Sequence, residues 1–533
     1  MKKVITTIFA SMLMLVSAFS QKEFKKIYEI KFPVSVDKWA SNEEETRVFA
    51  GDKSEFCGVD AVSGKVLWQV NVKELFGVKK VDKWYYEEEL GAIVVVIEKK
   101  KDEVETTYLD EMTGKKMGEP SKRKQSRTST SGLGWSGMFE SEWTGKGDIY
   151  LADQGLNLEL SYEAPAINGS FQRSKKFPIN VRCSGNKSWS TDLQGTFVRS
   201  LCDNVVGYGD NFGGDFITMY YEAGYVFVVY EGLSVIDVNS GKLVWETTFD
   251  YSTFDFGMLK SELIVGRAPM PVCDGSAVYV ADLSKDVRAI KKFDLASGKV
   301  LWTSERLPKD AIITEMVVEG GALIVRNGGE VLVQSLITNG NTGAQTCISE
   351  WKEEGDFSLN AYDTQTGKEL WVGDDLKSLG DKFKSISNLL NENGILYVAS
   401  DRNLFALDPK TANMKFKVDL AAMKIGKPDE IMFLGDDIFI SSEEGLARVE
   451  KATGKVKYST NTDKNLGAFV RGDVFYLWVG KKPDEINAFI RFNLESGAIE
   501  GKIEDTPHPY FSPDGNEFIK VKDDVLARYS TKG

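Results

Sequence analysis

The sequence predicts an all-β fold, a β-propeller of eight blades with four antiparallel strands each, and leaves seven to nine blades open. Two observations lead to this prediction: a short turn cassette returns along the chain, and β-branched and aromatic runs lie between its copies. The composition agrees, because 49 Gly against 13 Pro suits many tight hairpins. One small sheet cannot bury both of its faces, so neighbouring sheets are expected to stack around an axis.

The cassette reads Asp-x-x-Ser/Thr-Gly-Lys-x-Leu/Val-Trp and is clearest at residues 237–245, 294–302 and 363–371. Its Asp can accept a hydrogen bond from the backbone two residues on, and its Gly can adopt the positive φ that closes a turn. A short loop of this kind joins two antiparallel strands. Each cassette is therefore predicted to be a hairpin, with its aromatic residue four positions after the Gly.

Eight cassettes keep this frame at intervals that approach a period of roughly forty residues, which is typical of a β-propeller. Their turn positions are Gly64, Gly114, Gly241, Gly298, Gly367, Ala412, Gly454 and Gly497. The interval between Gly114 and Gly241 is wide enough for a ninth. Gly185 and Trp189 keep the same step there but have Val181 in place of the acid, so this copy stays an open question.

Strands are expected between the cassettes and at both ends of the chain. Apolar runs at 93–97, 225–230, 322–325 and 395–398 are typical of inner strands. Residues 24–32 alternate like a half-buried strand, with Tyr28 at the Trp position. Two further strands, at 518–521 and 525–529, have no cassette after them. The first strand is predicted to complete the last blade, so that pairing of the N- and C-terminal strands removes the exposed sheet edges.

Two regions depart from the repeat: an irregular insertion about residues 121–203 and a smaller one about 330–355. The stretch 121–136 holds Lys, Arg, Ser, Thr and Gly with little to bury, which predicts a solvated loop. Long loops on a rigid scaffold often carry binding residues. A decoration without function is the alternative for both insertions.

Charge and the N-terminal segment limit the partners and the location. A net charge of −13 argues against a nucleic-acid partner and against docking on anionic lipid. Residues 1–20 have a basic start, an apolar run and small residues before Ser20, which is typical of a signal peptide cleaved near Ser20. No later segment has the roughly 18 apolar residues of a membrane span. The sequence predicts an exported protein, periplasmic or extracellular, with residues 21–533 as the propeller and no lipid anchor.

The cassettes between Asp60 and Gly501 resemble the repeat of the pyrroloquinoline-quinone (PQQ)-type propeller family. The resemblance implies that the Trp of each repeat docks between adjacent blades. It does not imply one function, because the family includes quinoprotein dehydrogenases as well as scaffolds without a cofactor. One of those scaffolds is the propeller lipoprotein of the outer-membrane protein assembly machinery.

No catalytic, cofactor-binding or metal-binding residue is predicted. The single histidine, His508, lies between two prolines, which argues against His-based triads and His-ligated metals. The family's dehydrogenases use an adjacent pair of cysteines above the quinone and a calcium ion held by Glu, Asn and Asp. None of the five cysteines here is adjacent to another, and the calcium ligands find no match. The repeat tryptophans could stack a sugar, but their fixed place favours packing.

The predicted function is that of an exported, non-catalytic scaffold or binding module in the bacterial cell envelope, with a protein, peptide or glycan partner. Two alternatives stay open. One is a PQQ-dependent dehydrogenase with a degenerate site, and the other is a subunit of the outer-membrane protein assembly machinery.

Overall fold

The computed structural model describes residues 24–42, 46–87, 90–100, 103–118, 148–162, 176–195, 217–249, 253–256, 260–265, 269–284, 286–309, 311–340, 342–373, 385–471, 474–482, 485–504, 510–512 and 514–532. The predicted signal peptide, the predicted solvated loop at 121–136 and His508 lie outside these residues. The chain divides into two compact units, residues 1–138 with 460–533 and residues 139–459. Among the described residues, no helix is long and apolar enough to cross a membrane.

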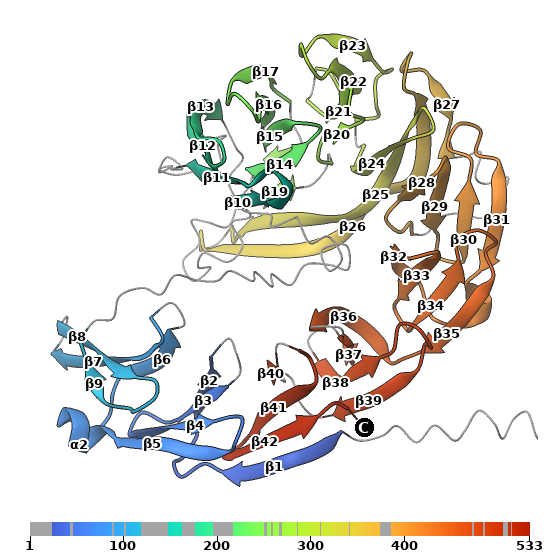
Figure 1. Cartoon of the computed structure of the whole chain (residues 1–533). Coiled ribbons are helices and arrows are strands. Elements are labelled where there is room, and N and C mark those ends of the chain that lie inside the picture. The colour runs from blue at the N-terminus through green and yellow to red at the C-terminus, as the bar shows by residue number, and fades with distance from the viewer. Residues whose placement is uncertain are drawn as a thin grey trace, which may run out of the picture. The chain divides into compact units, whose positions relative to one another are not determined.

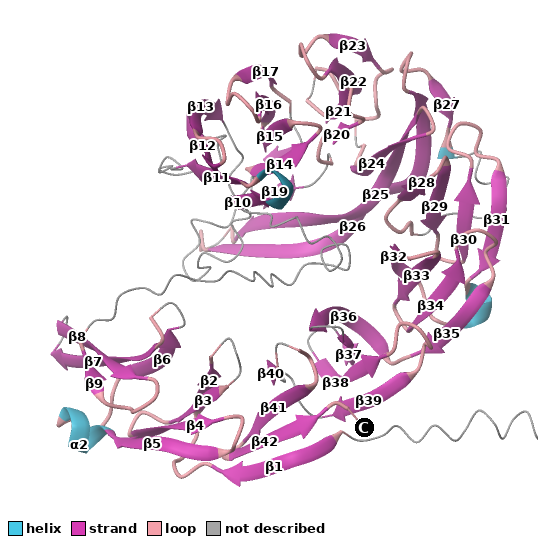
Figure 2. Cartoon of the chain, viewed as in Figure 1, coloured by secondary structure: helices cyan, strands magenta, loops and turns pink. Residues whose placement is uncertain are grey.

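The described residues of the first unit form four antiparallel sheets of four strands each (Figures 1 and 2). In chain order they are β2 (Lys38–Ser41), β3 (Arg47–Gly51), β4 (Glu55–Asp60) and β5 (Lys65–Asn71); β6 (Lys83–Glu87), β7 (Ala92–Lys100), β8 (Glu103–Asp110) and β9 (Lys116–Met117); β36 (Lys464–Arg471), β37 (Val474–Lys482), β38 (Glu485–Phe492) and β39 (Ile499–Glu504); and β40 (Tyr510–Phe511), β41 (Glu517–Lys522) and β42 (Val525–Ser530) with β1 (Lys25–Lys31). A short helix, α2 (Val72–Phe76), follows β5.

In the second unit, the residues that the structure describes form five four-stranded sheets and one six-stranded sheet. The five are β10 (Asp148–Leu151), β11 (Leu156–Tyr162), β12 (Phe177–Gly185) and β13 (Trp189–Gly195); β14 (Thr218–Glu222), β15 (Tyr225–Tyr230), β16 (Gly232–Asp237) and β17 (Leu243–Thr247); β20 (Val272–Cys273), β21 (Ala277–Asp282), β22 (Ala289–Asp294) and β23 (Val300–Thr303); β28 (Leu390–Glu392), β29 (Ile395–Ala399), β30 (Asn403–Leu407) and β31 (Met414–Asp419); and β32 (Pro428–Leu434), β33 (Asp437–Ser442), β34 (Gly445–Glu450) and β35 (Val456–Asn461). The sixth holds β18 (Thr253–Phe256), β19 (Lys260–Val265), β24 (Ile313–Glu319), β25 (Ala322–Thr338), β26 (Gln345–Asp363) and β27 (Glu369–Trp371). Two single 3-10 turns are Ala152–Gln154 and Ala421–Met423.

The cassettes form the predicted hairpins between the third and fourth strands of the sheets. In the copy between β22 and β23, the Asp294 carboxylate accepts hydrogen bonds from the Ser297 hydroxyl at 2.6 Å and from the Ser297 backbone N–H at 2.9 Å. The Ser297 hydroxyl bond holds the pKa of Asp294 below its ordinary value. Gly298 adopts φ +67° and donates its N–H to the Asp294 carbonyl. The acid and the glycine of the cassette thus close the turn, as predicted.

The repeat tryptophans join their sheets to the sheets that follow. The Trp302 ring is buried, donates its indole N–H to the Thr364 carbonyl at 3.0 Å and lies on Gly367, where a Cβ would come within 2.6 Å of the ring. The same bond joins Trp68 to Glu111, Trp245 to Leu295 and Trp371 to Pro409. In every case the acceptor is the residue after the turn acid of the following cassette. The predicted packing role of the repeat tryptophans is confirmed.

The N-terminal strand completes the C-terminal sheet, as predicted. β1 pairs antiparallel with β42, so that Ile30 lies opposite Leu526. Tyr28 stands where other sheets have Trp: its ring lies on Gly64 of the following cassette, and its hydroxyl donates to the Ala61 carbonyl at 2.5 Å. β1 therefore supplies the fourth strand of the sheet that β40, β41 and β42 begin, and it covers the edge of β42.

The stretch predicted as an irregular insertion about 121–203 contains a regular sheet. The prediction is wrong for β10–β13 at residues 148–162 and 176–195, and the rest of the stretch lies outside the described residues. The ninth cassette is a true hairpin, because Gly185 adopts φ +104° and Trp189 donates its indole N–H to the Val238 carbonyl at 2.9 Å. The lack of an acid at Val181 concealed it. Gly185 lies opposite Leu156, as Asp237 lies opposite Tyr225 in the next sheet, so this turn is shorter than a regular cassette.

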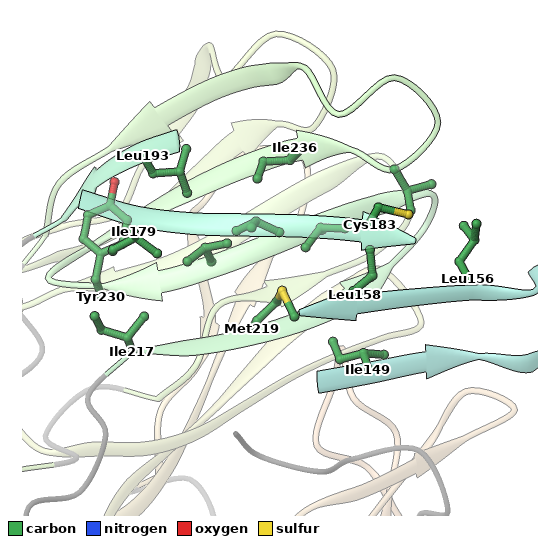
Figure 3. Close-up of a cluster of buried hydrophobic side chains, with 14 of the residues drawn as sticks. Ile149, Leu156, Leu158, Ile179, Cys183, Leu193, Ile217, Met219, Tyr230 and Ile236 are labelled. Carbon is green, nitrogen blue, oxygen red and sulfur yellow. The ribbon is translucent and has the colours of Figure 1, made fainter. Parts of the chain in front are cut away.

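A shared core shows that β10–β13 belongs to the stack (Figure 3). Leu158, Ile179 and Cys183 from this sheet are buried against Met219 and Ile236 from β14–β17. The described residues thus form ten sheets where eight blades were predicted. The two additional sheets are β10–β13 and the sheet completed by β1, which has no cassette to mark it.

A candidate binding cleft beside an inserted sheet

One sheet departs from the four-stranded pattern. β25 and β26 are longer than their neighbours: they continue beyond the residues that pair with β24 and β27. Figure 1 shows them as one long hairpin. The distal part of β25 pairs with β19, which pairs with β18. We call these segments, residues 253–256, 260–265, 329–338 and 345–354, the platform. It includes the smaller insertion predicted about 330–355, which is a paired hairpin.

Three glycines form the bend where the platform leaves the repeat sheet. The register of β25 on β26 shifts between Asn327 and Gly329, and Gly328, Gly329 and Gly355 all have positive φ. A Cβ on Gly355 would lie 3.1 Å from the Ile312 Cβ and 3.2 Å from the Gly328 Cα. Positive φ and close backbone approach both favour glycine, and a bulge of this kind redirects a strand.

Replacing Gly355 with alanine is expected to lower the free energy of unfolding by about 1–2 kcal/mol, because a side chain is strained at this φ and crowds Ile312. The matched control is Gly343→Ala in the turn at the platform tip, where φ is +69° and no atom lies within 4 Å of the added Cβ. Chemical denaturation of both variants gives two losses of unfolding free energy, and their difference is the cost of the contact with Ile312. Equal losses would show that the contact with Ile312 adds nothing to the cost of the substitution.

A chain of polar contacts fixes this bend to the next sheet. Thr314 donates its hydroxyl to the Gly328 carbonyl at 2.7 Å and accepts a bond from the Arg326 Nε at 2.9 Å. Arg326 lies 3.5 Å from the Glu315 carboxylate, which accepts the Leu389 N–H. Burial raises the pKa of Glu315 to about 7, although Arg326 acts in the opposite direction. The base of the platform is thus linked, through Thr314, to the ionisable pair of Arg326 and Glu315.

A cleft of about 1430 Å³ lies where the platform meets the repeat sheet. Three parts of the second unit line it: the platform, the segment 303–312 between β23 and β24, and the face of β25–β27. Pockets for small molecules usually hold about 300–1,000 Å³. The cleft has the size for a ligand larger than a typical metabolite.

The floor of the cleft is a ladder of polar side chains across three strands. The Asn327 amide donates to the Ser358 hydroxyl at 3.1 Å and to the Asn360 side-chain oxygen at 3.0 Å, and Asn360 donates to the Glu369 carboxylate at 3.2 Å. Burial, together with the charge of Glu369, raises the pKa of Tyr362 to about 12. Its hydroxyl therefore stays protonated at neutral pH. The floor offers amide, hydroxyl and carboxylate groups to a ligand.

The charged residues of the lining are mainly acidic. The acids are Glu262, Glu305, Glu354, Asp356 and Glu369, and the bases are Arg306, Lys309 and Lys368. Apolar contacts are available from Ile264, Leu307, Pro308 and Ile312. Such a lining suits a ligand that carries positive charge, amide groups and some apolar surface.

The residues noticed in the sequence do not meet in this cleft as a catalytic group. Trp68, Trp245 and Trp371 pack between sheets, as Trp302 does. Within the ranges that the structure describes, no three His, Cys, Asp or Glu side chains are grouped to hold a metal ion. Sequence reasoning missed Asn327, Ser358 and Asn360. Their signal was the pair Gly328–Gly329, which breaks an otherwise regular strand.

The fold defines the protein as a repeat β-propeller with an inserted sheet. The family model described as outer membrane protein assembly factor BamB matches residues 180–358 and 355–482, more than half of the chain. The chain belongs to this family of PQQ-type repeat propellers. No curated protein matches it.

Three solved structures are similar to the chain at low identity. The structure of BamB from Moraxella catarrhalis has 12% identity over 82% of this chain and 97% of its own, with a TM-score of 0.23. The computationally designed Ika8 protein has 10% identity over 80% and 100%, with a TM-score of 0.26. The dihydro-heme d1 dehydrogenase NirN in complex with DHE has 9% identity over 66% and 68%, with a TM-score of 0.32.

Proposed function

We propose that this protein is a non-catalytic binding propeller of the bacterial cell envelope, which holds a segment of a protein partner in the cleft beside the platform. The observation that carries the proposal is the cleft itself: a glycine bend directs the inserted hairpin away from the repeat sheet and leaves about 1430 Å³ beside it. The location in the envelope is supported by the family model, whose description is that of an outer membrane protein assembly factor.

A polypeptide segment fits the cleft better than a glycan does. Sugars are commonly held by an exposed aromatic face, and the rings of Tyr362 and Trp302 beside the cleft are only 5% and 8% exposed. The ladder formed by Asn327, Ser358 and Asn360 instead offers the donors and acceptors that match backbone amides. The acidic walls favour a segment that carries Lys or Arg.

The absence of catalysis is part of this proposal and is supported by the sequence, which has one histidine and no adjacent cysteines. Addition of the quinone with calcium is expected to leave the melting temperature unchanged. A ligand at 100 times its Kd would stabilise the protein by about 2.7 kcal/mol. A rise of that size would support the dehydrogenase alternative instead.

A role in outer-membrane protein assembly is the second candidate, and the family model favours it. It predicts that outer-membrane barrel proteins, or the proteins that insert them, are captured with this protein from native envelopes. Capture of periplasmic proteins alone would favour a general scaffold.

Charge reversal in the cleft is expected to remove the captured partner. Glu305 and Asp356 are exposed lining residues, so Glu305→Lys with Asp356→Lys changes the charge with little effect on packing. We expect at least a fivefold loss of partner in quantitative pull-downs from envelopes. The matched control is Glu443→Lys with Glu444→Lys on the turn between β33 and β34, which should capture as the wild type does. Equal capture by all three proteins would show that the cleft is not the binding site.

A further inference from the structure

The outer edge of the platform is an unpaired strand. Residues 345–354 of β26 pair with β25 on one side, and β27 pairs with β26 only at Ala361 and Tyr362. No described strand pairs with the other side of 345–354. Two large apolar side chains on this edge are open to solvent, Ile348 at 39% exposure and Trp351 at 65%.

The hydrogen-bond pattern of the hairpin identifies which backbone groups are free to pair. Asn339 donates its N–H to the Ala344 carbonyl at 2.8 Å, which makes these two residues a hydrogen-bonded pair. Such pairs alternate along an antiparallel ladder. The register then directs the N–H and C=O groups of Ile348 and Glu350 toward β25. Those of Cys347, Ser349 and Trp351 point outward, away from the sheet.

This edge carries little of the usual protection against strand addition. Natural edge strands are kept short or carry Pro, Lys or a bulge. Residues 345–354 contain no Pro, one Lys and three Glu. The one lysine, Lys352, already pairs with Glu350 at 2.6 Å. Glu262 of β19 lies opposite Ser335 of β25, which in turn lies opposite Ile348 of β26. Glu262 is therefore on the same face of the sheet as Glu350 and adds further negative charge.

We propose that the β26 edge binds an extended segment of the partner as an additional strand, with basic and apolar side chains alternating along that segment. This inference rests on the proposed function and specifies how the partner is held. Backbone bonds to Cys347, Ser349 and Trp351 supply the pairing, as in other strand-addition complexes. The basic residues complement Glu350 and Glu354, and apolar residues pack beside Trp351.

Charge favours this occupant over a second copy of the chain. If two β26 edges paired antiparallel about Glu350, the two Glu350 carboxylates would lie opposite each other across the new ladder. Like charges directly opposite are destabilising in a sheet. A segment that places Lys or Arg opposite Glu350 gains an attractive pair instead.

The experiment measures binding of a fluorescent peptide that alternates lysine with valine to the full chain, by fluorescence anisotropy. Ser349→Pro removes one outward N–H and leaves the ladder to β25 intact, because proline is tolerated on an edge. We expect this variant to bind at least tenfold more weakly than the wild type. The matched control Ser349→Ala keeps the N–H and is expected to bind within twofold of the wild type. A peptide with glutamate in place of lysine should bind at least tenfold more weakly.

A second pair of probes holds even if Ser349→Pro fails to fold. The same peptide is methylated on alternate backbone nitrogens, in two versions that differ by one position, so that only one version blocks the groups facing β26. One version should lose binding and the other should keep it. Equal binding of both versions, or full binding to a folded Ser349→Pro protein, would overturn the proposal. The proposal would also be overturned, in favour of a second copy, if the full chain formed a dimer that the Ser349→Pro substitution dissociates.

The pull-down separates this inference from the function on which it rests. If wild type and Ser349→Pro capture the same envelope partner equally while the Glu305→Lys and Asp356→Lys protein does not, the cleft binds the partner and the edge proposal is wrong. If only Ser349→Pro loses the partner, the edge holds it.

Discussion

Replacing Trp302 with alanine is expected to lower the free energy of unfolding by about 3–5 kcal/mol, the usual range for a buried aromatic residue. The ring is 8% exposed, lies against Gly367 and donates its N–H to the Thr364 carbonyl. The substitution therefore leaves a cavity between two sheets and a carbonyl without its indole donor. Chemical denaturation followed by fluorescence and by circular dichroism gives the difference from the wild type.

The matched control is Trp351→Ala on the platform, where the ring is 65% exposed. Its effect should stay within about 0.5 kcal/mol, as for most surface substitutions. A loss below about 1 kcal/mol for Trp302→Ala would mean that this ring does not join the two sheets.

The stability of the second unit is expected to depend on the ionisation of Glu315. Burial raises the pKa of this carboxyl in the folded protein to about 7, from an ordinary value of 4.5. Between these values the folded protein keeps a proton that the unfolded chain has lost. The contribution of Glu315 therefore falls as the pH rises through this window, by on the order of 3 kcal/mol in total.

The variant Glu315→Gln tests this dependence, because an amide of the same shape does not ionise. The melting temperature of the variant minus that of the wild type should rise between pH 4.5 and pH 8. Titration of the carboxyl by NMR measures its pKa directly. A constant difference across this range would show that Glu315 ionises equally in the folded and unfolded chain.

The elements set by local chemistry could be predicted from the sequence. The turn at Gly298 needs an acid, a small polar residue and a positive φ within five positions, and all three can be read from the chain. The wedge role of Trp302 follows from its fixed distance to that turn. Tyr28 could be placed at the same position because its strand alternates like the others.

The elements set by distant pairing could not be predicted. β19 pairs with β25 through residues such as Glu262 and Ser335, which are 73 positions apart and share no motif. The cleft depends on that pairing and on the bend at Gly355, so its lining was also hidden. The sheet β10–β13 was missed for a different reason: its turn at Gly185 has no acid and is shorter, because Cys183 already pairs with Trp189.

The pairing of β1 with β42 has a consequence for biosynthesis. β1 precedes every other described strand, and its partner is the last one. The ribosome therefore makes the first strand of this pair long before the second, and the sheet cannot be completed until synthesis of the second strand ends. A product terminated early would keep β1 without its partner, an exposed edge of the kind that favours aggregation.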